Sequence, residues 1–307
     1  MSNSKANSMS IAELQKHLAH KVLLLQVGDP LPSVREIAAQ THTAIGSVSI
    51  AFRNLEETGA VVVDRRGRLG SFIESRSIVD LWNTIEPDPL VIAFTLPGNL
   101  RFEGLATALK VLFNKAGVDT YLIFIRGSKT RLNALKENRC HIAVVSSFTA
   151  EMDSHPDQKI ILQLPSGTWL KGQKIFYRCE TLEEPYRVAL DPDSFDHSRL
   201  TELEFSTKNV IYQQITFSQV ARLLIEGQVD ASIWNTEDMR FNLAPTISSR
   251  PLSEHVNRVV MDRDLSASLV VRQEDSALQV LIKEVIQVAE LVEIQNSIIA
   301  GETMPAY

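Results

Sequence analysis

Two prolines, Pro87 and Pro89, divide the chain into segments whose apolar residues follow different spacings. Before them, apolar side chains recur at the three- and four-residue intervals of amphipathic helices. After them, short apolar runs alternate with amphipathic stretches, beginning with Leu90–Leu96. Because residues that precede proline avoid the helical conformation, a helix must end here. We therefore predict a domain at residues 1–76, a linker helix at 77–89 and a larger domain at 90–307.

The first segment predicts three helices followed by a β-hairpin. Helical spacing extends over Met9–Leu25, and Ser33 with Glu36 forms the S-x-x-E pattern that starts a second helix. A third helix ends at Gly59. Two strands within Val61–Ile73 then enclose a tip rich in arginine and glycine. The spacing thus predicts a compact α+β domain with a projecting hairpin.

The segment after the prolines predicts an α/β domain of two lobes. Alternating strands and helices imply a parallel sheet with right-handed crossovers. The alternation is interrupted by an irregular β-rich stretch at 159–179 and resumes in a second lobe at roughly 187–245. A late strand and one long final helix, Ala277–Ala300, are expected to complete one lobe.

Composition and charge narrow the possible functions. Residues 1–77 hold 9 Lys and Arg against 7 Asp and Glu, although the whole chain has a net charge of −6. A slightly basic end on an acidic body is typical of a nucleic-acid-binding domain joined to another module. The chain has only two cysteines, Cys140 and Cys179, no secretory leader and no apolar run near the roughly 20 residues that span a bilayer. We therefore expect a cytoplasmic protein without membrane association.

Several strings resemble known regulators. GDPLPSVREIAAQ, FRNLEETGAVVVDRRGR and GSFI resemble the winged helix-turn-helix of the GntR family, and FEGLATALK, RRGRLGSF, VDASIWN and IIAGETMPAY are similar to YhfZ-type regulators. The resemblance implies an α+β winged helix-turn-helix head plus an α/β two-lobed, type II periplasmic-binding-protein-like domain, as in LysR-type effector domains. It brings no known ligand with it.

A helix-turn-helix places its third helix in the major groove. The opening of that helix, Thr43–Ile50, lacks the basic residues common in GntR heads, so either its serines and Arg53 read bases or the wing and DNA shape do so. We expect Ile50 to pack against a neighbour. The candidate DNA-binding residues are Ser33, Arg35, Ser47, Ser49, Arg53, Arg65, Arg66 and Arg68.

Because one head offers few cationic contacts, we expect a homodimer on double-stranded operator DNA. The expected dimer contact is either the apolar stripe Ile78, Leu81 and Trp82 or the larger domain.

In open α/β sheets a ligand binds beyond the carboxyl ends of the strands. Arg126 follows such a strand and could grip a carboxylate or phosphate with two hydrogen bonds, although a surface ion pair is the alternative. Ser146 and Ser147 could equally cap the segment that follows them, and Trp234 could be a core residue. The candidate ligand-binding residues are Gly98, Asn99, Arg126, Ser128, Ser146, Ser147, Trp234 and Asn235, and the expected ligand is a small anionic effector.

An enzyme and an effector-independent DNA-binding dimer are the competing hypotheses. The sequence contains no HExxH, Walker, GxGxxG or GxSxG motif. Cys140 and His141 are adjacent on an expected strand, so they point to opposite faces. Asp191 and Asp193 flank a proline and fit a turn better than a metal site. We therefore expect a regulator with no catalytic residue, cofactor or metal.

Overall fold

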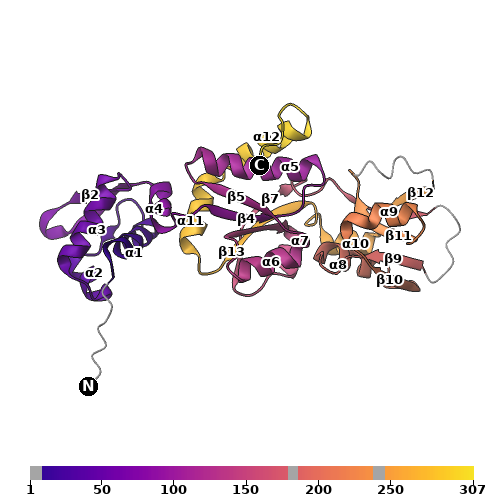
Figure 1. The fold of residues 1–307 in the computed structure, drawn as a ribbon, viewed down its shortest axis with the longest axis horizontal. Coiled ribbons are helices and arrows are strands. Elements are labelled where there is room, and N and C mark those ends of the chain that lie inside the picture. The colour runs from indigo at the N-terminus through magenta and orange to yellow at the C-terminus, as the bar shows by residue number, and fades with distance from the viewer. Residues whose placement is uncertain (1–8, 179–185, 238–245) are drawn as a thin grey trace, which may run out of the picture. The chain divides into compact units, whose positions relative to one another are not determined.

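The computed structural model describes residues 9–178, 186–237 and 246–307. The chain divides into two compact units. The first contains Met1–Leu90, Phe113–Thr120 and Asp275–Ile286, and the second contains Val91–Leu112, Tyr121–Glu274 and Gln287–Tyr307. We call the winged part of the first unit the head and the second unit the body (Figure 1).

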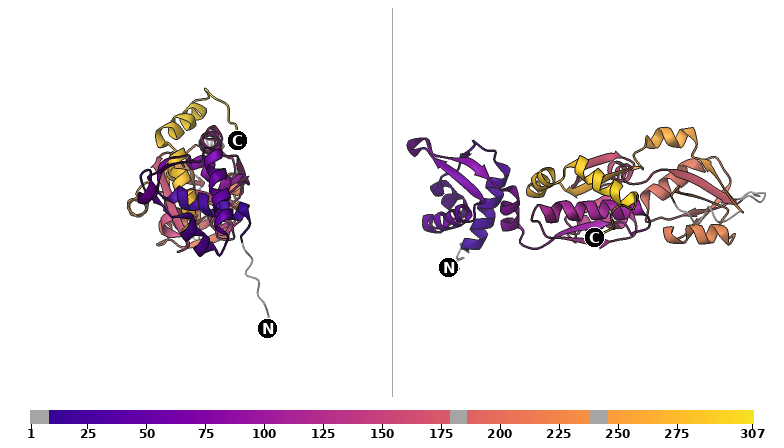
Figure 2. Two further views of the ribbon diagram at one scale, coloured as in Figure 1. Left: turned by 90° about the vertical axis from the view of Figure 1, so that its left-hand side faces the viewer. Right: turned by 90° about the horizontal axis from the view of Figure 1, so that it is seen from above.

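The head has the predicted three helices and hairpin (Figure 2). Ser10 and Ser33 each accept a hydrogen bond from the backbone of the glutamate three residues on, which completes a capping box at α1 and α2. A short strand adds to the hairpin, so the sheet order is β1-β3-β2. Its elements are α1 (Ile11–Leu24), β1 (Pro30–Leu31), α2 (Val34–Thr41), α3 (Ile45–Glu57), β2 (Val61–Arg65), η1 (Gly67–Leu69) and β3 (Ser71–Arg76).

Two further helices pack on α1 within the first unit, namely α4 (Ile78–Ile85) and α11 (Ser276–Val285). The predicted stripe lies on α4, but Leu81 is fully buried and Trp82 is only 5% exposed. These two side chains are core residues of the unit, because they face α1 and α11. Leu81 and Trp82 are therefore not available for the expected dimer contact, and of the predicted stripe only Ile78 remains partly exposed.

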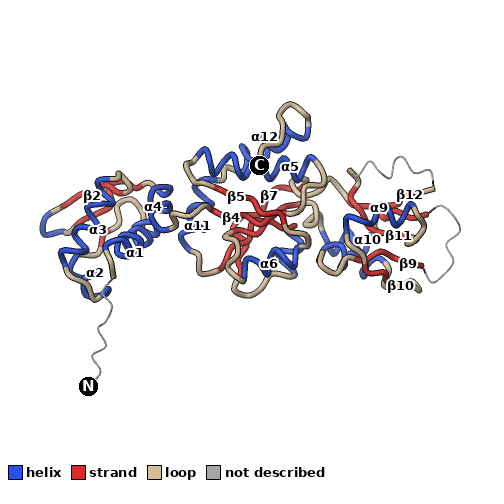
Figure 3. Tube along the Cα trace, viewed as in Figure 1, coloured by secondary structure: helices blue, strands red, loops and turns tan. Residues whose placement is uncertain are grey.

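The first lobe of the body has a five-stranded sheet of order β5-β4-β6-β13-β7. Strands β4 and β6 are parallel, whereas β13 is antiparallel to both of its neighbours, so the predicted parallel sheet is a mixed one. Helices α5 and α6 lie on opposite sides of the sheet (Figure 3). The elements are β4 (Leu90–Phe94), α5 (Leu100–Lys115), β5 (Thr120–Phe124), α6 (Ser128–Lys136), β6 (Ile142–Ser146), α7 (Ser147–Met152), β7 (Gln158–Ser166), β13 (Ser266–Arg272) and α12 (Val288–Ile299).

The second lobe has a sheet of order β10-β9-β11-β8-β12. It extends beyond the expected span of 187–245, because β8 precedes that span and β12 and α10 follow it; residues 238–245 of the span lie outside the described residues. Its elements are β8 (Gln173–Arg178), β9 (Tyr186–Leu190), α8 (Phe195–Glu204), β10 (Val210–Gln214), η2 (Phe217–Gln219), α9 (Val220–Ile225), β11 (Ala231–Asn235), β12 (Ile247–Pro251) and α10 (Glu254–Val260).

The predicted single C-terminal helix is wrong, because it is two helices, α11 and α12. The break falls at Ile286 and Gln287, which both have extended backbones. The division between the two compact units falls at the same point. The apolar spacing continues across the break without proline or glycine, so the sequence pattern carried no signal for it.

Within the described ranges, none of the helices has both the length and the apolar character needed to span a membrane.

Candidate functional site

A cavity of about 410 Å³ opens between the two lobes of the body. The loops that follow β4, β5, β9 and β11 contribute to it, as expected at the carboxyl ends of strands. Ser147 does not line it, because its buried hydroxyl lies 2.8 Å from that of Ser268. The other seven candidate ligand-binding residues do line it: Gly98, Asn99, Arg126, Ser128, Ser146, Trp234 and Asn235.

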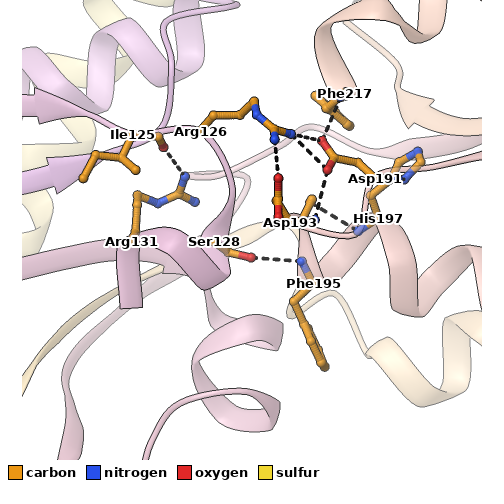
Figure 4. A network of polar contacts seen from close by, with 10 residues as sticks. Ile125, Arg126, Ser128, Arg131, Asp191, Asp193, Phe195, His197 and Phe217 are labelled. Carbon is orange, nitrogen blue, oxygen red and sulfur yellow. Dashed lines mark hydrogen bonds and ion pairs between the residues drawn. The ribbon is translucent and has the colours of Figure 1, made fainter. Parts of the chain in front are cut away.

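Arg126 forms an ion pair across the cavity rather than facing it alone (Figure 4). One of its nitrogens donates to both carboxylate oxygens of Asp191, at 3.0 and 2.8 Å, and the other donates to Asp193. Asp191 is 1% exposed and also accepts from the backbone N–H groups of Asp193 and Phe217. The guanidinium of Arg126 is thus neutralised, and it joins one lobe to the other.

Two neighbours of Arg126 extend this junction. The hydroxyl of Ser128 accepts a hydrogen bond from the backbone N–H of Phe195 at 3.0 Å. The backbone of Gly127 lies directly against Asp193. The segment that begins α6 is therefore fastened to the segment that begins α8.

Arg131 is the cavity cation that the sequence analysis missed. It is 3% exposed and donates from Nε to the carbonyl of Val144 and from Nη1 to that of Ile125, both at 2.9 Å. Burial lowers its pKa to about 10. Among the described residues, no carboxylate lies within 4.0 Å of it. The helix was predicted near Arg131–Glu137, whereas α6 begins at Ser128 and thus places Arg131 in its first turn, beside the strand ends.

Asp196 and His197, at the start of α8, also line the cavity and were not predicted. Oδ1 of Asp196 accepts from the hydroxyls of Ser146 and Thr149 at 2.8 and 2.7 Å, and burial raises the pKa of Asp196 to about 6. Nδ1 of His197 accepts from the backbone N–H of Asp191, so the neutral ring carries its proton on Nε2. Burial lowers the pKa of His197 to about 4.

Aromatic rings form the apolar part of the wall. Phe102 and Trp169 of the first lobe have ring centroids 4.7 Å apart. Phe217 and Trp234 of the second lobe are stacked at 3.9 Å. Trp234 is only 2% exposed, so most of its ring is core and one edge reaches the cavity.

No catalytic pair forms at Cys140 and His141. Nδ1 of His141 accepts from the backbone N–H of Val91 at 2.9 Å, and burial raises the pKa of Cys140 to about 11. Asp191 and Asp193 bind Arg126. Across residues 9–178, 186–237 and 246–307, no cluster of three His, Cys, Asp or Glu side chains is arranged to hold a metal ion.

The candidate DNA-binding arginines of the head differ in their partners. Arg65 is paired with Glu56 of α3, and Arg66 is paired with Asp64 and lies 4.5 Å from the ring centre of Phe72. Three further arginines are exposed and have no carboxylate partner in the part of the chain that the structure describes: Arg35, Arg53 and Arg68.

The serines and isoleucines of the head are placed as follows. Ser33 caps α2, Ser49 donates to the carbonyl of Ile45 at 3.0 Å, and Ser47 is partly exposed. Ile45 and Ile50 of α3 are 52% and 44% exposed. Ile50 is therefore only partly covered by its neighbours, and the outer face of α3 is partly apolar.

Comparisons with known proteins agree with this architecture. Residues 78–307 match the family described as the YhfZ C-terminal domain, and residues 26–73 match a helix-turn-helix domain. The chain is 27% identical over 293 residues to the uncharacterized protein YhfZ of Escherichia coli (strain K12), which covers 94% of this chain and 95% of that protein.

Solved structures are also similar. The crystal structure of YhfZ from Shigella flexneri has a TM-score of 0.63 and 26% identity, over 75% of this chain and 98% of that one. An OxyR C206 mutant of Corynebacterium glutamicum has a TM-score of 0.48 and 12% identity, over 95% of each chain. The body itself is a two-lobed α/β domain with one five-stranded sheet in each lobe. With three quarters of its length matching the family domain, this chain belongs to the YhfZ family.

Proposed function

We propose that the protein is a transcriptional regulator whose head binds double-stranded operator DNA and whose body binds a small effector that modulates this binding. One observation carries the proposal. The same chain contains a helix-turn-helix head and a cavity lined by a buried guanidinium, Arg131, that has no carboxylate within 4.0 Å among the described residues; Asp196 acts on it only over a longer distance. A buried charge is costly to maintain without a counterion, so an anionic group of an occupant would stabilise it.

In the head, α3 would enter the major groove in the GntR-like manner while the wing contacts phosphates or the minor groove. Arg35, Arg53 and Arg68 supply charges that are not already neutralised. Arg65 and Arg66 would have to exchange Glu56 and Asp64 for phosphates. The exposed Ile45 and Ile50 offer contacts to thymine methyl groups, which compensates for the scarcity of basic residues on this helix.

The regulator would act as a cytoplasmic homodimer and not as an enzyme. One head provides few phosphate contacts, so useful affinity requires two heads on one operator. The half-sites would then lie one helical turn apart, or a multiple of it. The dimer contact would come from the body, because Leu81 and Trp82 of the linker helix are buried within the chain.

A selection of genomic fragments with the purified full chain, followed by fluorescence anisotropy, tests this proposal. Sequence-selective binding is expected, and the Arg35→Ala, Arg53→Ala, Arg68→Ala triple variant should lose it. The matched control changes three exposed body arginines, Arg139, Arg199 and Arg222, to alanine and removes the same net charge. Equal loss in both variants, or no selective binding by the wild type, would contradict the proposal.

A further inference from the structure

We infer that the molecule bound in the cavity is a zwitterion of the α-amino-acid type with an apolar or aromatic side group, because the cavity presents a cation, Arg131, and a carboxylate, Asp196, that form no salt bridge among the described residues. This inference names the ligand class of the proposed effector site and therefore rests on the proposed function. It is based on the charged side chains that line the cavity and take part in no salt bridge among the described residues of the body.

The cation of the cavity, the guanidinium of Arg131, is held in a fixed position by its own hydrogen bonds. A guanidinium has five N–H donors, and Arg131 uses one on Nε and one on Nη1 for backbone carbonyls. These two bonds hold its plane against Ile125, directly after β5, and Val144, within β6, and the remaining donors are available to an occupant. A carboxylate matches that fork with two parallel hydrogen bonds. A buried, pre-oriented arginine of this kind is a receptor for a carboxylate group.

The carboxylate of the cavity, that of Asp196, belongs to the other lobe. Oδ1 of Asp196 already accepts two hydroxyl hydrogen bonds, whereas no hydrogen bond to Oδ2 forms among the described residues. No salt bridge joins Asp196 to Arg131, although both line the same cavity. An ammonium group can donate to the free oxygen and neutralise the carboxylate. An occupant with only negative charge would satisfy Arg131 but repel Asp196.

The other ionisable groups around the cavity do not change this balance. Arg126 is neutralised by Asp191 and Asp193, and burial keeps the ring of His197 neutral at pH 7 by lowering its pKa to about 4. The carboxylate of Asp264, bound by the side-chain amide of Gln173, raises the pKa of Asp196 further, whereas the positive charge of Arg131 lowers it. Negative potential near Asp196 favours a cationic group at that end.

The cavity walls indicate the rest of the molecule. Phe102 and Trp169 line one lobe and Phe217 and Trp234 line the other, with Leu96 at the edge. A volume of about 410 Å³ is at the small end of the range for ligand pockets. An amino acid whose side group packs against these rings fits both the size and the apolar lining.

Calorimetric titration of the full chain with apolar and aromatic L-amino acids tests the inference. Each is compared with its 2-oxo acid and its decarboxylated amine, such as L-phenylalanine with phenylpyruvate and phenethylamine. At least one amino acid should bind saturably, and both of its analogues should bind about tenfold or more weakly, since each lacks one charge-assisted hydrogen-bonded group. A 2-oxo acid that binds as tightly as its amino acid would overturn the inference.

The Asp196→Asn variant provides the second test, because an amide oxygen can still accept from Ser146 and Thr149. The variant should bind the amino acid about tenfold or more weakly and the 2-oxo acid with equal or higher affinity. Wild-type affinity for the amino acid should fall between about pH 8 and pH 5 as Asp196 is protonated. If no amino acid binds at about 1 mM while the same preparation binds operator DNA selectively, the inference is wrong and the regulator proposal stands. If DNA binding fails as well, the proposed function fails too.

Discussion

Gly127 lies against the backbone of Asp193 so closely that a β-carbon at Gly127 would come within 2.7 Å of the carbonyl oxygen of Asp193. Gly127 belongs to the first lobe and Asp193 to the second, and Gly127 has a φ of +81°, which favours glycine. The ion pair of Arg126 with Asp191 lies beside this contact. The lobes can approach to this distance only because position 127 carries no side chain.

Replacing Gly127 with alanine should separate the lobes. The added methyl group meets backbone rather than a flexible side chain, so relief requires movement of one lobe against the other. We expect a larger radius of gyration for the body in small-angle X-ray scattering and a Tm lower by several degrees. The Gly301→Ala variant is the control, because its φ of +75° imposes similar strain with no atom within 4 Å of the new carbon. Equal effects of the two substitutions would show that strain alone is responsible.

The wing arginines should contribute unequally to DNA binding. Arg68→Ala should weaken binding more than Arg66→Ala, because Arg66 must first leave Asp64 and the ring of Phe72. The Arg65→Ala, Arg66→Ala, Arg68→Ala variant should weaken binding to all sequences. The slope of the logarithm of the binding constant against the logarithm of the salt concentration should become shallower by about 0.9 for each phosphate that the wing no longer neutralises. Anisotropy titrations over a salt series measure this, and an unchanged slope would exclude phosphate binding by the wing.

His197 should make the body sensitive to acid. Its folded pKa of about 4 is below the unfolded value of 6.5, so the unfolded chain binds the proton first as the pH falls. The stability contributed by the neutral ring is complete above pH 6.5 and is lost progressively towards pH 4, by about 3 kcal/mol. Urea unfolding of His197→Gln should lack this loss, and His255→Gln, which changes an exposed histidine, should retain it. Parallel pH curves for wild type and His197→Gln would disprove the assignment.

Asp196 should have the opposite effect on stability. Its folded pKa of about 6 is above the unfolded value of 3.8, so the folded state holds the proton longer, and this stability is lost as the pH rises from 3.8 through 6. The unfolding free energy of Asp196→Asn relative to wild type should therefore rise by about 2 kcal/mol between pH 4 and pH 7. Asp262→Asn, at an exposed aspartate, should show no such trend. A flat difference for Asp196→Asn would mean that its carboxyl titrates normally.

Local sequence patterns were sufficient to predict the three helices and the hairpin of the head, and the order of most helices and strands in the body. The S-x-x-E pattern at Ser33 gives a capping box whose partners lie within one turn, so no distant residue is needed to form it. The return of strand–helix alternation after residues 159–179 predicted the two lobes of the body, and the resemblance to known regulators implied the same arrangement. The same local patterns failed at Ile286, where apolar spacing is continuous but the chain passes from one compact unit to the other.

The candidate site was predictable only in part. Strand ends could be located from apolar runs, which placed Arg126, Ser128 and Ser146 near one cavity. The residues to which these side chains bind could not be found from apolar runs. Arg126 meets an aspartate 65 residues further along the chain, and Ser147 turns into the core although it follows Ser146 directly.

The sequence by itself therefore determined the approximate positions of most helices and strands, which residues could cap them and which loops follow the strands, because each of these depends on neighbours within a few positions. Only the tertiary structure decided which charges are neutralised. Pairing depends on which lobe or strand lies opposite. That arrangement neutralises Arg126, whereas Arg131 and Asp196 form no salt bridge with any residue that the structure describes.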